Sequence, residues 1–307
     1  MQAVWYEHYG PPSVLHFGER ELPQPGPGQV RVRVLASALA QVDVKLRAGL
    51  LQAHFPLQLP KIPGRDGAGV IDALGPGVDA WRVGDEVCVL AAPLAAGTAA
   101  SHVVCEVSRV VARPAGLGLE QAAALIQPGA SAWAAVTTAS LKAGMRVLVH
   151  GGSGAVGALV LQQARALGVH VTATCHHSHR EHTLAQGAHE VIAYDREDFG
   201  GLRNLDVVFD FVGGQTHDRS YALVRPAGAI VYLVAAPFKD RSAETGVRVL
   251  RAMVSDAPEV LQAVAQAASQ GIYRPLVSRV MALRDASSAH AALEQGEIRK
   301  GRVVFRH

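Results

Sequence analysis

The sequence predicts an α/β protein with two domains: a β-rich first third, and a doubly wound parallel sheet after it. Three observations support this. At 307 residues the chain is longer than a single hydrophobic core comfortably serves. Its first third alternates apolar and polar residues, as half-buried strands do. From about residue 118 strand-like and helical stretches alternate, which indicates a parallel sheet with helices on both faces.

The first 117 residues contain short strands separated by turns. In QVRVRVLASA, residues 29–38, valines alternate with polar residues at a period of two. PQPGPGQ at 23–29 and GPGVDAWRVGDEVCVL at 75–90 supply glycine- and proline-rich turns. This arrangement predicts a partly open barrel or a sandwich.

The central region follows a different rhythm. Residues 119–139 are predicted to be helical, with a break at Pro128–Gly129. Strands are expected at 145–150, 169–174, 190–194, 206–212 and 229–235, with helices after the first and near 215–224. VRVLRAMV at 247–254 predicts a sixth strand, and 257–271 an alanine-rich helix. Short strands return around a helix at 285–296.

Composition narrows the function classes. The net charge is only +3 and the basic residues are scattered, so neither nucleic acid nor an anionic membrane is the expected partner. Neither a signal peptide nor an apolar run of membrane-spanning length is evident. The three cysteines form no disulfide framework, which fits a reducing compartment. We expect a cytoplasmic protein that acts on a small molecule.

The stretch VLVHGGSGAVGALVLQQA, residues 147–164, carries the strongest functional signal. Gly152, Gly154 and Gly157 spell G-x-G-x-x-G, and Gly151 adds a looser match. A predicted strand enters this turn and a predicted helix leaves it, the context in which glycines let backbone N–H groups approach a pyrophosphate. The sequence therefore predicts a dinucleotide site in a Rossmann domain, at a turn that also contains Ser153, Ala155 and Val156.

The end of the second strand bears on which dinucleotide binds. An NAD site favours an acidic residue there, but Thr174 leads into CHHSHREH, residues 175–182, where the first acid is Glu181. We interpret this as a preference for NADP(H), with His176, His177 and Arg180 beside the 2′-phosphate. Two alternatives remain open: a metal cluster, although the spacing lacks a paired distal ligand set, and a solvated loop rich in histidine. No metal is expected.

Taken together, these motifs resemble the medium-chain dehydrogenase/reductase superfamily, in its zinc-independent quinone oxidoreductase (zeta-crystallin-like) branch. The resemblance runs nearly end to end, through 1–15, 23–39, IPGRDGAGVIDALGPGV at 62–78, WRVGDEV at 81–87, 120–136, 191–199, 206–231 and GRVVF at 301–305. It implies a GroES-like catalytic domain formed by both ends of the chain, 1–117 with 271–307, a central Rossmann domain at 118–270, and an active site in the cleft between them.

The resemblance also makes certain absences informative. Zinc-dependent relatives carry a catalytic Cys after the strand that here reads VRVLASA, and a Gly-His-Glu motif where this chain has Gly64, Arg65 and Asp66. The ligands of a catalytic zinc are thus missing, as is the four-cysteine structural site. The Tyr-x-x-x-Lys pair of short-chain dehydrogenases is absent too. Where zinc-free relatives read Asn-Pro-x-Asp-x-Tyr, Ala40 replaces the Asn and Lys45 the Tyr.

The resemblance places further residues at the cofactor. Gln127 and Ser131 are expected to face the nicotinamide, Tyr194 the adenosine phosphate, Val212 and Gly213 the ribose, and Ala235 and Ala236 the nicotinamide.

Within the β-rich domain, Lys45 is the candidate catalytic residue, as an ammonium that stabilises a developing enolate or hydroquinone oxygen, with a surface lysine as the alternative. Asp43 is interpreted as a helix N-cap. For Arg65, contact with substrate and a structural ion pair both remain open.

Two functions are therefore considered. The first is NADPH-dependent reduction of a quinone or an α,β-unsaturated carbonyl compound by direct hydride transfer without metal. The second is a non-catalytic NADPH-binding redox sensor or structural protein, suggested by the residues at 40 and 45. The edge strand predicted at 247–254 further suggests a homodimer, as in relatives.

Overall fold

The computed structural model describes residues 1–233 and 238–307, which form two units. Unit 1 comprises 1–127, 256–271 and 275–307, and unit 2 comprises 128–255 and 272–274. Residues 118–127 and 256–270 therefore group with the terminal segments, not with the central domain as expected. The reason is packing: α2 (Leu119–Ala123) contacts β3 and β4, and α8 (Pro258–Ser269) contacts β7, all strands of unit 1.

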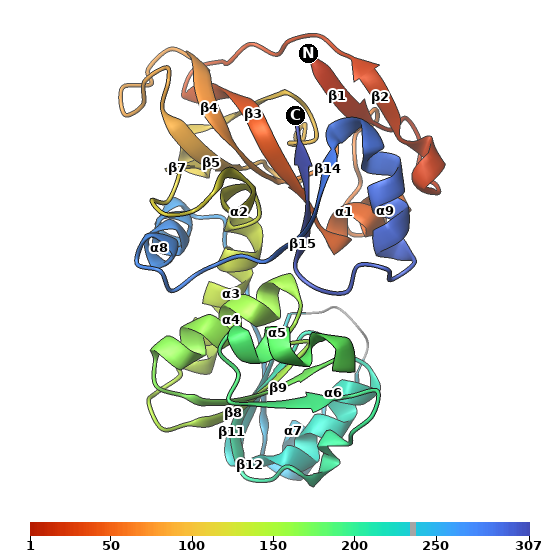
Figure 1. The fold of residues 1–307 in the computed structure, drawn as a ribbon, viewed down its shortest axis with the longest axis vertical. Helices are drawn as coiled ribbons and strands as arrows, with labels where there is room; N and C mark the ends of the chain where they lie inside the picture. The colour runs from red at the N-terminus through yellow and green to blue at the C-terminus, as the bar shows by residue number, and fades with distance from the viewer. Residues whose placement is uncertain (234–237) are drawn as a thin grey trace. The chain divides into compact units, whose positions relative to one another are not determined.

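Unit 1 is built on a mainly antiparallel sheet of seven strands (Figure 1). Its order is β14-β15-β3-β4-β5-β7, with β6 also pairing with β3, and only the β14–β15 pair is parallel. A separate antiparallel pair, β1 (Gln2–Trp5) with β2 (His16–Glu19), precedes it. The seven strands are β3 (Gln29–Leu39), β4 (Asp66–Leu74), β5 (Glu86–Leu90), β6 (His102–Glu106), β7 (Val110–Ala112), β14 (Val277–Ala282) and β15 (Arg302–Arg306).

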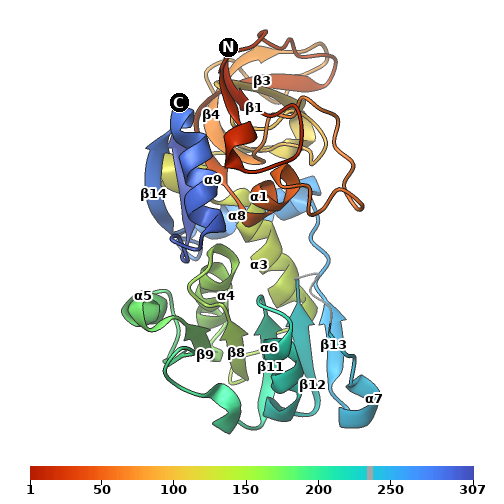
Figure 2. The ribbon, with the colours of Figure 1, turned by 90° about the vertical axis from the view of Figure 1, so that its right-hand side faces the viewer.

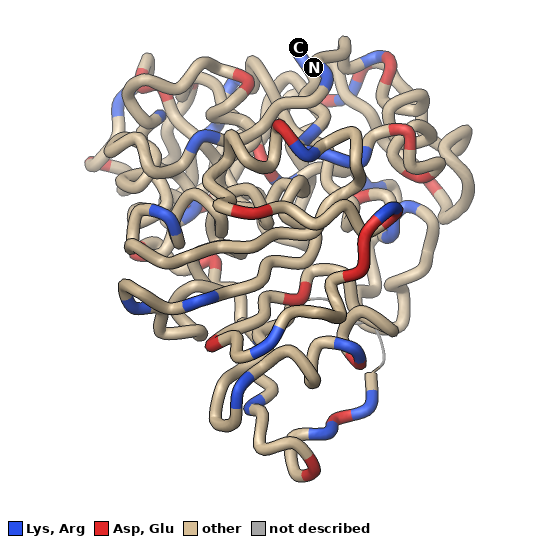
Figure 3. Tube along the Cα trace, turned by 60° about the horizontal axis from the view of Figure 1, so that its bottom comes forward, with Lys and Arg blue, Asp and Glu red and all other residues tan. Residues whose placement is uncertain are grey.

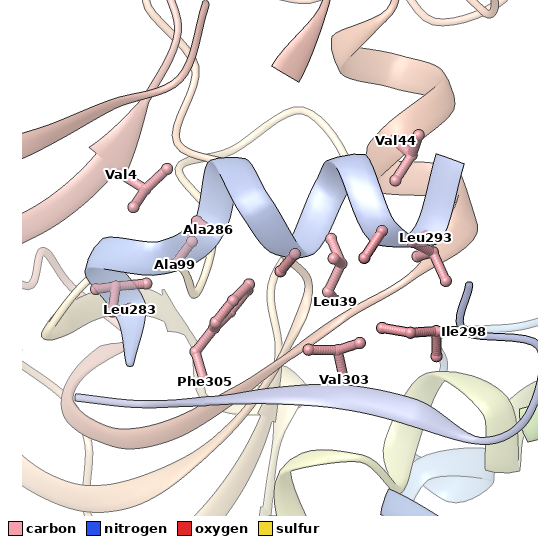
Figure 4. Packing of buried hydrophobic residues seen from close by; sticks show 12 residues of the cluster. Val4, Leu39, Val44, Ala99, Leu283, Ala286, Leu293, Ile298, Val303 and Phe305 are labelled. Carbon is pink, nitrogen blue, oxygen red and sulfur yellow. The ribbon is translucent and has the colours of Figure 1, made fainter. Parts of the chain in front are cut away.

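The two ends of the chain share one core in this unit. The helix α9 (Ala286–Glu294) contacts β14 and α1 (Gln41–Arg47), and its apolar side chains share a core cluster with residues of β3 and β15. Figure 4 shows Phe305 and Val303 of the last strand pointing at this helix from below, with Leu39 and Val44 completing the cluster. Burial of such side chains stabilises the unit by about 1.5–3 kcal/mol each. The expected β-rich, GroES-like domain is confirmed.

Unit 2 contains a six-stranded sheet in the order β10-β9-β8-β11-β12-β13, and every pair is parallel (Figure 2). The predicted Rossmann sheet is therefore confirmed. Its strands are β8 (Arg146–His150), β9 (His170–Cys175), β10 (Glu190–Ala193), β11 (Leu205–Asp210), β12 (Val224–Tyr232) and β13 (Arg248–Arg251). Its helices include α4 (Ala155–Ala166), α5 (Arg180–Ala185), α6 (Gln215–Ser220) and α7 (Ser242–Thr245).

The strand order reverses beside β8, and this fixes where a ligand is expected. From β8 the chain adds β9 and β10 on one side, and then β11, β12 and β13 on the other. In open parallel sheets, ligands bind at the carboxyl ends of the strands at such a reversal. The glycine turn follows β8 directly.

One local prediction was wrong. The helix α3 (Ile126–Ala139) continues through Pro128 and Gly129, and the interruption instead lies at 124–125, after α2. Pro128 is tolerated because it falls in the first turn of α3, where its missing N–H has no helical acceptor.

Two features of the described residues bear on possible partners: the distribution of charge and the character of the helices. Lysine and arginine are interspersed with aspartate and glutamate along the Cα trace (Figure 3). In the described part of the chain, no helix is both long enough and apolar enough to cross a membrane.

Candidate cofactor site

The glycine turn after β8 has the geometry that close approach of a ligand requires. Gly151 adopts a positive φ of 76°, and the turn is closed by a hydrogen bond from the N–H of Gly154 to the carbonyl of Gly151, at 3.0 Å. A second bond, from the N–H of Gly152 to the carbonyl of Thr174 at 3.0 Å, attaches the turn to β9. The helix α4 then begins with Gly154 as its N-cap. The turn therefore presents a helix N-terminus at the carboxyl edge of the sheet.

A side chain at the third glycine would not fit. A Cβ on Gly157 would lie 2.3 Å from the carbonyl oxygen of Gly151 and 2.9 Å from the Cα of Gly152. A Cβ on Gly152 would lie 2.8 Å from that of Ala173 on β9. These glycines therefore allow strand, turn and helix to pack together, as the fingerprint predicts. Ser153 is buried inside the turn, whereas Ala155 and Val156 form the half-buried first turn of α4.

Buried polar side chains support the turn from below. His150, the last residue of β8, hydrogen bonds through Nδ1 to Thr174 Oγ1 at 3.1 Å and through Nε2 to Ser220 Oγ at 3.2 Å. Burial lowers the pKa of His150 to about 4, so the ring is neutral at pH 7. Thr174 Oγ1 also accepts from the N–H of Gly151, at 3.4 Å.

The loop after β11 borders the same turn. Val212 is about half exposed, and its Cγ2 lies 3.6 Å from the position of a Cβ on Gly151. Asp210 Oδ1 accepts from the N–H groups of Val212 and Gly213 at 2.9 and 2.8 Å, and Oδ2 accepts from His217 Nδ1 at 2.8 Å. Burial alone would raise the pKa of Asp210, but these hydrogen bonds outweigh it and lower the pKa. A buried carboxylate thus fixes this loop.

The loop after β9 contacts a carboxylate from the loop after β10, and the sequence around β9 gave no sign of it. Asp195, which follows β10, accepts from the N–H of His177 at 2.8 Å and from its Nδ1 at 2.5 Å. His176 Nε2 lies 3.5 Å from the same carboxylate, and the His176 ring meets the exposed Tyr194 edge-on at 6.2 Å. Partial desolvation acts to raise the pKa of Asp195, but the bonds from His177 lower it to about 2.

Arg180 is engaged within the protein. Its Nη1 donates to the carbonyl of Val191 at 2.8 Å, and its Nη2 forms an ion pair with Glu197. Both side chains of that pair are more than one third exposed, so the pair contributes no more than about 1 kcal/mol. An incoming phosphate can replace Glu197 at small cost.

Four further residues were predicted to contact the cofactor. Gln127 and Ser131 lie at the start of α3, and the N–H of Gln127 donates to Asp66 Oδ1 at 2.7 Å. Ala235 and Ala236 lie outside the described residues.

In unit 1, the predicted catalytic residue Lys45 is exposed on α1.

The prediction that Asp43 is the N-cap of α1 was wrong. Ala40 is the N-cap, and Asp43, at the third helical position, accepts a hydrogen bond from the N–H of Ala40 at 2.8 Å. Its burial raises the pKa of Asp43. Arg65 forms the structural ion pair, at 2.6 Å from Asp256.

The residues at the place where zinc-dependent relatives hold zinc do not fit a metal. Asp66 is fully buried and paired with Arg302 at 2.9 Å, while Arg65 donates to the carbonyl of Ala91 and to Asp256. An arginine offers no lone pair to a cation, and the Asp66 carboxylate is already matched by a guanidinium. This position therefore has a structural role.

Lys61 was not singled out from the sequence. Its ammonium donates to the carbonyls of Pro93 and Ala95, and burial lowers the pKa of Lys61 to about 8. Together with Tyr6 and Asp43 it lines a cavity of about 10 Å³. That volume admits no more than about one water molecule, so it is not a site for a quinone ring.

Comparison with known proteins places the chain in a family. Residues 26–109 match the alcohol dehydrogenase GroES-like domain, and residues 186–305 match the zinc-binding dehydrogenase family. The chain is 31% identical to a quinone oxidoreductase of Pseudomonas aeruginosa, over 95% of both chains.

Solved structures agree. A quinone oxidoreductase from Coxiella burnetii superposes with a TM-score of 0.90 at 29% identity, covering 100% of this chain and 99% of the other. The Escherichia coli quinone oxidoreductase complexed with NADPH gives a TM-score of 0.90 at 25% identity, over 100% of both chains. With the GroES-like unit, the Rossmann sheet and the glycine turn all in place, the chain belongs to the medium-chain dehydrogenase/reductase superfamily, in its quinone oxidoreductase branch.

Proposed function

We propose that this oxidoreductase uses NADPH to reduce a quinone or an α,β-unsaturated carbonyl compound, without a catalytic metal. The observation that carries the proposal is the glycine turn at a strand-order reversal, where a Cβ on Gly157 would lie 2.3 Å from the carbonyl of Gly151. Family membership supports an oxidoreductase, and the missing zinc ligands at Arg65 and Asp66 support chemistry without a Lewis acid.

A bound nicotinamide supplies the hydride, and the protein supplies binding and orientation. The N–H groups at the start of α4 bind the pyrophosphate and Thr174 holds the turn to β9. The loop at Val212 and Gly213, fixed by Asp210, borders the ribose. Because these contacts are preformed, binding does not require the turn to reorganise.

The preference for NADPH rests on the residues after β9. β9 ends on Cys175 and is followed by His176, so the carboxyl end of this strand offers no acidic side chain of its own to a ribose 2′-hydroxyl. His176, His177 and Arg180 provide donors for a 2′-phosphate, once Arg180 exchanges Glu197 for the phosphate.

Lys45 is proposed to stabilise the oxyanion that develops on the acceptor. An ammonium held near that oxygen lowers the energy of the transition state more than that of the neutral ground state. Lys45→Met should therefore lower kcat and leave the Kd for NADPH unchanged. Lys142→Met, at another exposed lysine, is the matched control and should change neither.

The experiment that tests the proposed function is a turnover screen. Purified protein is supplied with NADPH or NADH and a panel of benzoquinones, naphthoquinones and enones, and cofactor oxidation is followed at 340 nm. We expect turnover of at least one class with a higher kcat/KM for NADPH. Absence of both NADPH binding and turnover would overturn the proposal.

A second candidate function is supported by Ala40 and Lys45, which replace an Asn and a Tyr of the family pattern. A chain that binds NADPH without catalysing its oxidation would act as a redox sensor or a structural protein. Tight NADPH binding with no turnover across the whole panel would favour this function over the enzyme.

A further inference from the structure

The loops after β9 and β10 bring two imidazoles and one carboxylate together. His177 Nδ1 and His176 Nε2 lie 2.5 and 3.5 Å from Asp195 Oδ2. One nitrogen from each ring and a carboxylate oxygen all lie within 4.8 Å of one another. In the described ranges 1–233 and 238–307, no other set of three His, Cys, Asp or Glu side chains meets this criterion.

Neighbouring groups hold these three side chains in place. The N–H of His177 donates to Asp195 Oδ1 at 2.8 Å, which leaves Oδ2 directed at the two rings. His176 Nδ1 accepts the N–H of Ser178 at 3.3 Å and lies 2.9 Å from Ser178 Oγ, so Ser178 holds this nitrogen and Nε2 is the one that faces Asp195. Metal-binding histidines are commonly oriented by such partners on their second nitrogen. The three side chains are 24%, 36% and 23% exposed, so an ion can reach them from solvent.

We propose that His176, His177 and Asp195 form a binding site for a divalent transition-metal ion, best suited to Zn²⁺. Two imidazole nitrogens and one carboxylate oxygen favour Zn²⁺, Cu²⁺ or Ni²⁺ over Mg²⁺ and Ca²⁺, which prefer oxygen ligands.

The spacing suits this ion. Zinc–ligand distances of about 2.0–2.1 Å place tetrahedral ligand atoms about 3.3 Å apart. The distance from His176 Nε2 to Asp195 Oδ2 is already 3.5 Å. The distance from His177 Nδ1 to Asp195 Oδ2 is 2.5 Å and increases by less than about 1 Å when the metal replaces the proton between these atoms. The fourth position is left to solvent.

The site runs against the sequence-based expectation of no metal, which rested on the missing distal ligand. Asp195 is that ligand, 18 residues after His177 and delivered by the adjacent parallel strand. The site is separate from the place in unit 1 where zinc-dependent relatives hold zinc. It shares His176 and His177 with the proposed 2′-phosphate site, so metal binding is measured without cofactor and NADPH binding without metal.

A second pair of histidines in unit 2 provides a matched control. His170 and His189 stack at 4.7 Å, with Glu190 3.3 Å from His170. There, however, the possible ligand atoms of His170, His189 and Glu190 do not all lie within 4.8 Å of one another, and His189 Nδ1 accepts the N–H of Val171 at 3.1 Å. We expect no tight metal binding at this pair.

The test uses the full chain without a polyhistidine tag and without cofactor. Bound metal is first removed with a chelator, and the chelator is then removed. Zn²⁺ is titrated by calorimetry, and Co²⁺ by its visible absorption, which reports tetrahedral coordination. The wild type should bind one ion per chain, and Zn²⁺ should raise its Tm. Asp195→Asn and His176→Gln should each weaken binding at least about tenfold, because each removes a ligand. His170→Gln should bind like the wild type.

The two ligand variants, Asp195→Asn and His176→Gln, each preserve part of the local hydrogen bonding, so that a loss of metal binding can be separated from a loss of fold. Asp195→Asn retains an oxygen to accept the N–H of His177, and His176→Gln leaves the His177 bond intact, so circular dichroism should report native folds. The proposal is overturned if the wild type binds no ion, if both variants bind like the wild type, or if only His170→Gln loses binding. NADPH binding measured in the presence of chelator tests the proposed function separately.

Discussion

Replacing Gly157 by alanine is the sharpest test of how the turn binds its ligand. A Cβ there would approach the carbonyl of Gly151 to 2.3 Å and the Cα of Gly152 to 2.9 Å, where ordinary contacts begin at 3.4 Å. The turn must therefore move by about 1 Å relative to α4. Since the obstructing atoms are backbone, no side-chain rotation can relieve the contact.

The expected effect on stability is small and the effect on binding is large. Overpacking costs about 1–3 kcal/mol, and the higher helix propensity of alanine offsets about 1 kcal/mol of it. If the shift moves one backbone N–H of the turn away from a pyrophosphate oxygen, a charged hydrogen bond of about 1.5–3 kcal/mol is lost. Gly157→Ala should therefore weaken NADPH by about 10- to 100-fold, while the Tm falls by only a few degrees.

The assay is a fluorescence or calorimetric titration with NADPH, paired with thermal unfolding. Gly201→Ala is the control, because a Cβ at Gly201 meets no atom within 4 Å and its backbone is not in the left-handed region. It should bind like the wild type. If Gly157→Ala also binds within threefold of the wild type, the turn is not the pyrophosphate site.

Three further outcomes are expected. Arg180→Ala should weaken NADPH about tenfold and leave NADH unchanged, because the exposed pair with Glu197 is easily exchanged for phosphate; equal losses for both cofactors would show that Arg180 only supports the loop. His290 is buried with its pKa lowered to about 3, so the unfolded state binds its proton first and wild-type stability falls as pH drops from about 6.5 towards 3. His290→Leu should reduce this pH-dependent loss of unfolding free energy by up to about 1.4 kcal/mol per pH unit, measured by urea unfolding at pH 7 and pH 5. If the unfolding free energies of wild type and variant change equally between these pH values, the expectation is contradicted. If β13, the last strand in the sheet order, pairs two chains, sedimentation should show a dimer that Met253→Glu weakens, since Met253 is 70% exposed beside that strand; a monomeric wild type would contradict it.

Features encoded in contiguous residues were predictable from the sequence. The alternation in 29–38, the strand and helix rhythm after 118 and the turn at 151–157 each depend on neighbours a few positions apart, and all three recur in the structure. The glycines could be interpreted because their role is steric and local: a Cβ on Gly157 meets the carbonyl of Gly151, six residues away.

Contacts between residues far apart in the sequence could be known only from the tertiary structure. Asp195 reaches His176 because β9 and β10 are adjacent and parallel, and parallel strands end at the same edge of a sheet. The engagement of Arg180 by Glu197 follows from the same juxtaposition. The helix α8 joins unit 1 because its apolar face packs on β7, although the chain reaches it directly from the Rossmann strands. The periodicity of a segment determines whether it forms a helix or a strand, but the partners of its side chains depend on which strands become neighbours.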